Sequence, residues 1–134
     1  TGDARSDAGF DVTLVPLTAT AAHAVPAAGL LLQHSPFRIG RAQDAREVNL
    51  DSNDLVLADE KPYHVSRNHC AIEIRADGVF VHDRGSYLGT IVNGTHVGGK
   101  HRKGSVPLAV GENEVIAGSS HSPFQFRVTV TSRS

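Results

Sequence analysis

The chain has 134 residues, with 13 Lys and Arg against 14 Asp and Glu, so its formal net charge is -1 at pH 7. This length suits one domain with a single core, and the near-neutral charge gives no reason to expect nucleic acid or an acidic membrane as a partner. No apolar run approaches the roughly 18 residues that span a bilayer, and the single cysteine, Cys70, cannot form an internal disulfide, which favours a reducing, cytoplasmic location.

The first nine residues are small, polar and charged, which predicts a flexible lead-in over residues 1–9 and a single domain over residues 10–134. We expect no signal peptide, because charged residues interrupt this segment and no apolar stretch follows it at once. The chain contains no Met and begins with Thr1, so we expect it to be part of a longer polypeptide.

Short segments in which apolar and polar residues alternate recur along the chain, and this pattern is typical of strands. The expected strands cover residues 10–14, 30–32, 37–39, 55–57, 70–75, 79–82, 90–92, 95–97, 114–116 and 124–131. Asp77-Gly78 and Asn93-Gly94 are hairpin signals, and Glu112-Asn113 is expected to turn. The 18–29 stretch fits a short helix or a loop. About ten to eleven short strands with frequent turns predict an all-β sandwich.

Four clusters of polar residues and glycines lie between these strands: Gly40-Arg41, Ser66-Arg67-Asn68-His69, Asp83-Arg84-Gly85-Ser86 and Asn93-Gly94. A guanidinium such as that of Arg41 binds phosphate oxygens through a planar fork, and the hydroxyl of Ser66 can donate a further hydrogen bond. Taken alone, Arg41 is better explained as a surface residue pairing with Asp44 or Glu47, and Ser66 as a turn hydroxyl bonded to its own backbone. Together, the clusters favour an anion site.

The order and spacing of the clusters resemble a forkhead-associated (FHA) domain over roughly residues 30–130. The resemblance implies a β-sandwich that reads phosphothreonine peptides of partner proteins with loops at one end, without catalysis or cofactor, in phosphorylation-dependent signalling or assembly. It assigns phosphate binding to Arg41 and Ser66, with help from Arg67. It also implies that His69 braces the loops without touching the ligand. The residues expected to support the binding loops are Gly40, His69, Ser86, Gly89, Asn93 and Gly94.

One position departs from the family's pattern. The family usually carries Ser-Thr-Asn-Gly-Thr where this chain has Ser86-Tyr87-Leu88-Gly89-Thr90, so Leu88 replaces the Asn that contacts the peptide backbone. The lost hydrogen bond is worth about 0.5–1.5 kcal/mol, whereas each charge-assisted bond that remains is worth about 1.5–3 kcal/mol. We therefore expect a weakened site. The expected peptide-binding residues are Arg41, Ser66, Arg67, Asn68, Tyr87 and Leu88.

One alternative to phosphopeptide binding, and several details of the site, remain open. The pocket could be degenerate, in a module that binds partners independently of phosphorylation. Asn68 is close enough in sequence to replace the missing amide, while Leu88 could offer an apolar contact and Tyr87 a ring. The basic run of residues 100–103 fits a solvated loop better than a wider positive field, and it is too short to indicate nucleic-acid binding.

Catalysis and metal binding are not expected. Ser66, His69 and Asp83 form a nominal Ser-His-acid set, but no G-x-S-x-G elbow surrounds the serine. The eight His residues lack C-x-x-C or H-E-x-x-H spacing, so no metal is expected. Cys70 alternates with apolar residues, which predicts a buried thiol. Nothing in the sequence sets an oligomeric state.

Overall fold

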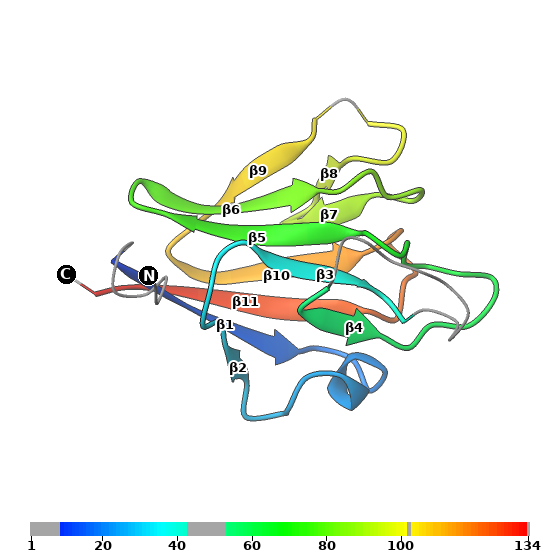
Figure 1. The fold of residues 1–134 in the computed structure, drawn as a ribbon, viewed down its shortest axis with the longest axis horizontal. Helices are drawn as coiled ribbons and strands as arrows, with labels where there is room; N and C mark the ends of the chain where they lie inside the picture. The colour runs from blue at the N-terminus through cyan, green and yellow to red at the C-terminus, as the bar shows by residue number, and fades with distance from the viewer. Residues whose placement is uncertain (1–8, 43–52, 102, 134) are drawn as a thin grey trace.

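The computed structural model describes residues 9–42, 53–101 and 103–133, which form two β-sheets stacked face to face (Figure 1). The strands of these residues are β1 (Phe10–Pro16), β2 (Leu30–Leu31), β3 (Phe37–Arg41), β4 (Leu55–Leu57), β5 (Cys70–Arg75), β6 (Gly78–Asp83), β7 (Thr90–Val92), β8 (Thr95–Val97), β9 (Ser105–Leu108), β10 (Gly111–Ala117) and β11 (Gln125–Ser132). A single 3-10 turn, η1 (Ala21–His23), lies in the 18–29 stretch. Apart from Gly9, the expected lead-in lies outside the described residues.

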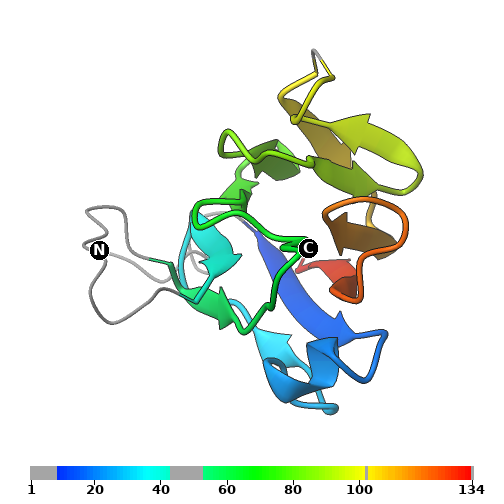
Figure 2. The same cartoon turned by 90° about the vertical axis from the view of Figure 1, so that its right-hand side faces the viewer.

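The two sheets have six and five strands. The first runs in the order β2-β1-β11-β10-β7-β8, and the second in the order β4-β3-β5-β6-β9. Every neighbouring pair is antiparallel except β3 and β4, which run parallel with Gly40 opposite Val56. Figure 2 looks along the strands and shows the two sheets facing each other. The all-β sandwich predicted from the sequence is confirmed, with eleven strands. No helix in the described part of the chain has the length and apolarity needed to cross a membrane.

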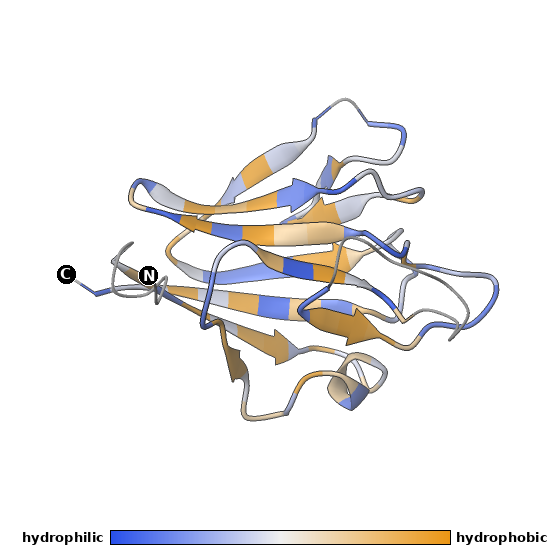
Figure 3. Cartoon of the chain, viewed as in Figure 1, coloured by the Kyte–Doolittle hydropathy of each residue, from blue (hydrophilic) through white to orange (hydrophobic). Residues whose placement is uncertain are grey.

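The core lies between the two sheets and follows the alternation seen in the sequence. In β11, Phe126 and Val128 are buried while Arg127 between them is partly exposed, because successive side chains point to opposite faces of the sheet. Figure 3 shows the same alternation of apolar and polar residues along several strands. Cys70 is buried in this core, as expected, and burial raises the pKa of its thiol to about 12. The thiol therefore behaves as a small apolar group.

One predicted turn is present but displaced by one residue, and another is wrong. The β5–β6 hairpin is present, but Arg75 pairs with Gly78, so its loop residues are Ala76 and Asp77. Asn113 does not turn the chain, because β10 already begins at Gly111. The first turn is shifted by one residue and still includes Asp77, whereas the second ends before Glu112.

Strand β9 was not predicted, because Pro107 interrupts its apolar pattern. Proline cannot donate a backbone hydrogen bond, so strands tolerate it mainly at the edge of a sheet. β9 is such an edge strand, and Pro107 lies opposite Phe80 of its single neighbour, β6. The position of the strand in the sheet, which the sequence does not reveal, therefore explains the missed prediction.

Asn113 is a buried polar residue that closes the β9–β10 connection. Its Oδ1 accepts hydrogen bonds from the N–H of Ala109 (2.9 Å) and from Nδ2 of Asn93 (2.9 Å). Its Nδ2 donates to the carbonyl oxygens of Ala109 (2.8 Å) and Val128 (3.1 Å). Because buried polar groups cost stability when they lose their partners, the fold depends on this amide.

We predict that Asn113→Ala lowers the free energy of unfolding by about 2–4 kcal/mol, because it leaves buried backbone groups unpaired. Urea unfolding measures the change. Glu112→Ala is the matched control, since Glu112 is exposed in the same strand and should change stability by less than about 0.5 kcal/mol. Equal stability of the two variants would contradict the prediction.

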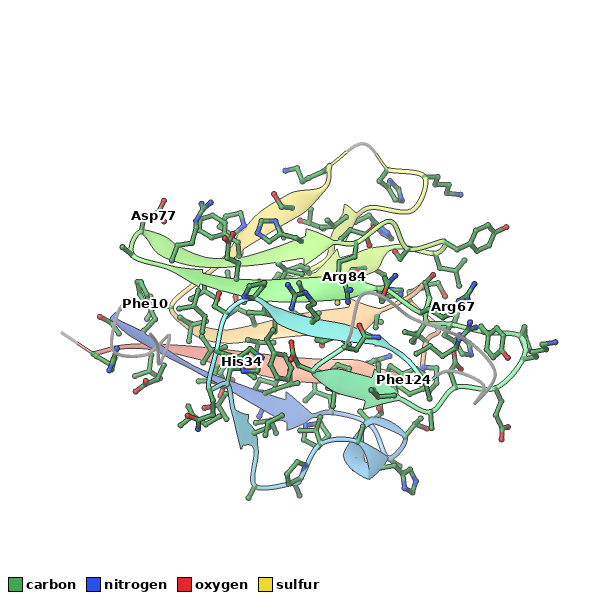
Figure 4. The ribbon with its side chains drawn as sticks, in the orientation of Figure 1. Phe10, His34, Arg67, Asp77, Arg84 and Phe124 are labelled. Carbon is green, nitrogen blue, oxygen red and sulfur yellow. The ribbon has the colours of Figure 1, made fainter. Side chains whose placement is uncertain are left out.

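The connections that carry the predicted binding residues gather at one end of the sandwich, on the right in Figure 1. They are residues 58–69 and 84–89, together with Arg41 at the end of β3. The described residues of the β8–β9 connection, 98–101 and 103–104, and the β10–β11 connection lie at the same end. Figure 4 shows Arg67 at this end and Asp77 and Phe10 near the opposite end, where the N–H of Arg133 donates to the carbonyl of Gly9 (2.9 Å). We call the first the loop end.

Candidate functional site

The predicted phosphate ligands share one hollow at the loop end. This hollow, about 330 Å³ in volume, is lined by Arg41, Tyr63, His64, Val65, Ser66, Arg67, Tyr87 and Leu88. A larger hollow of about 550 Å³ lies beside it, but its lining includes the acidic Asp59 and Glu60 and none of the predicted ligands. We place the candidate site in the smaller hollow because it presents two guanidinium groups and a hydroxyl, which suit an anion.

Arg41 stands at the end of β3, where the chain leaves the sheet. Its guanidinium lies 3.7 Å from the centroid of the Tyr63 ring, a cation–π contact that holds the charge in place. Its backbone N–H donates to the carbonyl of Ser66 (2.9 Å), which ties β3 to the loop that carries the other predicted ligands. The sequence analysis missed Tyr63, and its only signal was an aromatic residue in a polar loop.

Gly40 allows the Ser66–Arg67 segment to approach β3. A Cβ atom on Gly40 would lie 1.9 Å from the carbonyl oxygen of Arg67 and 2.6 Å from Nδ2 of Asn53. Asn53 also donates from this Nδ2 to the Arg67 carbonyl (2.8 Å), so the segment is held from two sides. No side chain fits at position 40 without moving the backbone of Arg67.

Gly40→Ala should displace the Ser66–Arg67 segment and lower the free energy of unfolding by about 1–3 kcal/mol or more, because the new methyl group meets backbone atoms. Gly104→Ala is the matched control, since nothing lies within 4 Å of a Cβ there, and its stability should stay within about 0.5 kcal/mol. Urea unfolding gives both values. The steric argument fails if the two variants are equally stable.

His69 is fully buried and joins two loops. Its Nδ1 accepts a hydrogen bond from the N–H of Ser66 (3.0 Å), and its Nε2–H donates to the carbonyl of Gly89 (2.7 Å). Burial lowers the pKa of His69, which agrees with a neutral ring whose Nδ1 is free to accept. The imidazole therefore links the β4–β5 loop to the start of β7 in the other sheet.

Ser66 is fixed on the side that faces Tyr87. Its Oγ accepts a hydrogen bond from the backbone N–H of Tyr87 (2.9 Å). This bond leaves the hydroxyl proton to donate to another acceptor, such as a ligand oxygen in the hollow. Ser66 thus meets the 84–89 loop directly through its side chain and indirectly through His69.

The lowered pKa of His69 predicts a pH-dependent stability. The unfolded chain takes up a proton on this histidine below about pH 6.5, whereas the folded chain keeps the ring neutral to lower pH. The stability contribution is present above pH 6.5 and is lost as the pH falls through the folded pKa, by up to about 1.4 kcal/mol per pH unit.

Urea unfolding at pH 7, 6 and 5 should therefore show a smaller loss of stability on acidification in His69→Gln than in the unmodified chain. His121→Gln serves as control, because His121 is exposed, and it should keep the unmodified pH dependence. An identical dependence in His69→Gln and the unmodified chain would show that the buried imidazole does not couple folding to protonation.

Asp83 organises the loop that carries Tyr87 and Leu88. Its Oδ2 accepts from the N–H groups of Gly85 (3.0 Å) and Ser86 (2.9 Å), and its Oδ1 accepts from the Ser86 hydroxyl. The Ser86 Oγ in turn accepts from the N–H of Gly89 (3.0 Å). Ser86 and Asp83 thus shape the loop together. The sequence analysis considered Asp83 only as a nominal catalytic acid and missed this structural role.

These bonds argue against a catalytic relay. Asp83 is hydrogen bonded within its own loop, and both ring nitrogens of His69 are bonded to the backbone groups of Ser66 and Gly89. The nominal Ser-His-acid set is therefore not connected by side-chain hydrogen bonds. Among the described residues, no three His, Cys, Asp or Glu side chains are placed to hold a metal ion.

Asp59 is a second organising carboxylate that the sequence analysis missed. Its Oδ2 accepts from the N–H groups of His64 (2.7 Å) and Val65 (2.9 Å), and its Oδ1 accepts from the N–H of Glu60 (2.9 Å). The bonds shape the loop that presents Tyr63 to Arg41. In a sequence, an Asp before a polar loop only weakly predicts that its carboxylate organises the loop, because the N–H groups that it binds lie up to six residues away.

The structure does not bring Asn68 or the Asn93-Gly94 pair into the hollow. Asn68 points its Oδ1 at the guanidinium of Arg84 (3.2 Å) and lies outside the lining. Asn93 and Gly94 have φ of 50° and 83°, as a type I′ turn requires, and they close the β7–β8 hairpin. The side chain of Asn93 meets Asn113, so its contacts support β10 instead of the binding loops.

Comparison with known proteins identifies the class of this chain. The model of the FHA domain family matches residues 37–112, more than half of the chain. The chain therefore belongs to the FHA family, whose members are non-catalytic interaction modules that bind phosphopeptides. None of the curated protein sequences with which it was compared is significantly similar.

Solved structures agree on the fold. Mycobacterium tuberculosis EmbR in complex with a low affinity phosphopeptide has a TM-score of 0.60 at 20% identity, over 91% of this chain and 25% of that one. The FHA domain of CT664 from Chlamydia trachomatis has a TM-score of 0.59 at 22% identity, over 92% of this chain and 99% of that one. The FhaA FHA domain in complex with the intracellular domain of Rv3910 has a TM-score of 0.51 at 24% identity, over 89% of this chain and 98% of that one. This chain thus spans a quarter of EmbR.

Proposed function

We propose that this chain binds phosphothreonine-containing segments of partner proteins in the hollow formed by Arg41, Ser66 and Arg67. The observation that carries the proposal is the convergence of these three side chains, from β3 and the β4–β5 loop, on one hollow at the loop end. The backbone bond from Arg41 to Ser66 fixes their relative positions. We further propose that this recognition serves phosphorylation-dependent signalling or assembly in the cytoplasm.

The chemistry of the hollow matches a phosphate group. A phosphorylated side chain carries about -1.5 to -2 charges and three strong acceptor oxygens. Two guanidinium groups and one hydroxyl can donate to these oxygens through charge-assisted bonds. Since the net charge of the chain is -1, attraction to the phosphate must arise locally at these residues. The ring of Tyr63 and the side chain of Leu88 add apolar surface for the methyl group that distinguishes phosphothreonine from phosphoserine.

The solved relatives support a protein partner. EmbR is in complex with a phosphopeptide, and the FhaA FHA domain is in complex with an intracellular protein domain. They support a protein or peptide partner for this chain.

A second candidate function is partner binding that does not depend on phosphorylation. Two exposed side chains beside the hollow favour it, because Tyr87 is 85% and Leu88 is 39% exposed. Large exposed apolar side chains often mark a contact surface. Under this second function, Leu88 contacts the partner through apolar burial, in place of the hydrogen bond that the family's Asn makes to a peptide.

Calorimetry with matched phosphothreonine, phosphoserine and unmodified peptides, chosen from a phosphothreonine peptide library, tests the proposal. We expect Arg41→Ala to weaken binding of the phosphothreonine peptide about 10- to 100-fold, the equivalent of one charge-assisted hydrogen bond. Arg38→Ala is the matched control, because Arg38 is exposed on the same strand outside the hollow. Equal affinity for phosphorylated and unmodified peptides, unchanged in Arg41→Ala, would favour the second candidate.

A further inference from the structure

A second hollow adjoins the candidate phosphate site. It has a volume of about 270 Å³ and is lined by Tyr87, Leu88, Lys100 and His101. Tyr87 and Leu88 also line the first hollow, so these two side chains form a wall shared by both. A ligand that fills the first hollow and crosses this wall enters the second.

The described residues of the β8–β9 loop, 98–101 and 103–104, begin with two glycines that pack closely against the wall and the Asp83 side chain below it. A Cβ on Gly98 would lie 2.0 Å from Cγ of Asp83, and one on Gly99 would lie 3.0 Å from the carbonyl carbon of Leu88. The φ angles of Gly98 and Gly99 are 70° and 59°, a region that favours glycine. Gly98 therefore lets the loop approach the Asp83 side chain, and Gly99 lets it approach the backbone of Leu88.

Hydrogen bonds shape the loop that presents Lys100 and His101. The N–H of Gly98 donates to the carbonyl of Lys103 (2.7 Å), and the N–H of His101 donates to the carbonyl of Gly98 (2.9 Å). The His101 ring also packs on that of His96, with centroids 4.7 Å apart. Lys100 and His101 thus occupy defined positions on a tight turn.

The charge of this loop is of one sign. Residues 98–104 read Gly-Gly-Lys-His-Arg-Lys-Gly and contain no acidic residue. Among the described residues, no carboxylate forms an ion pair with Lys100, whose side chain is exposed. The second hollow therefore combines an apolar wall with a cation that an anionic side chain can neutralise.

From these contacts we infer that the second hollow binds an anionic side chain of the same peptide, close to its phosphothreonine. The inference rests on the proposed function. An extended peptide advances about 3.3 Å per residue, so side chains within four positions of the phosphothreonine can reach a neighbouring hollow. The peptide crosses Leu88, where the family's pattern has Asn, and Lys100 selects an acidic residue beyond it. Selectivity is thereby transferred in part from the 84–89 loop to the β8–β9 loop.

The test is a positional scan of phosphothreonine peptides. Asp, Ala, Lys and phosphoserine are placed in turn at each of four positions on both sides, and affinities are measured by fluorescence anisotropy at low and high salt. At one or more positions we expect Asp to bind about two- to fivefold more tightly than Ala, as for an exposed ion pair. Lys should bind more weakly than Ala, and salt should reduce both differences. A gain with phosphoserine alone would assign the hollow to a second phosphate.

The deciding quantity is the ratio of the Asp and Ala affinities, which a uniform loss of binding does not change. Lys100→Ala should bring this ratio to about one, while Lys103→Ala, in the same loop but outside the hollow, should leave it unchanged. The inference is overturned if no position prefers an anion, or if both variants change the ratio equally. If the Ala-flanked phosphothreonine peptide binds without any such preference, the proposed function stands alone. If no phosphothreonine peptide binds, both the inference and the proposed function are wrong.

Discussion

The loop end of this molecule depends on one buried imidazole. His69 accepts from the backbone of Ser66 and donates to the backbone of Gly89. It thereby joins a loop of the five-stranded sheet to the residue that directly precedes β7 of the six-stranded sheet. The ring and its bond to Gly89 are buried, and the bond from Ser66 is partly buried, so an unpaired partner would be costly. The ring also sets the distance between the hydroxyl of Ser66 and the segment that carries Leu88, and hence the width of the candidate site.

Around this imidazole, most of the positioning is done by backbone contacts and by two carboxylates that do not face the ligand. Asp59 and Asp83 each collect N–H groups of their own loop, and Gly40 admits the Arg67 backbone to β3. Arg41 is steadied separately by an aromatic ring. The groups that we assign to the phosphate are therefore preorganised, which reduces the entropy lost on binding.

Much of the fold and part of the site could be predicted from the sequence. Alternating strands such as β11 reveal their buried face directly. The resemblance to the FHA family pointed to Arg41 and Ser66, and both of these residues line one hollow. The rest depends on contacts between distant segments. Tyr63 matters because it lies under Arg41, and β9 tolerates its proline because it is an edge strand. The local pattern of residues predicts neither the contact of Tyr63 with Arg41 nor the edge position of β9.

The close approach of Gly98 and Gly99 to the neighbouring loop has an evolutionary consequence. Since Gly98 packs on the Asp83 side chain and Gly99 on the backbone of Leu88 and Gly89, the fold constrains the glycines and leaves the exposed side chain of Lys100 under little structural constraint. Mutations at the tip can accumulate without loss of stability. The β8–β9 loop is thus a place where this lineage can acquire new partners while the imidazole-braced frame stays the same.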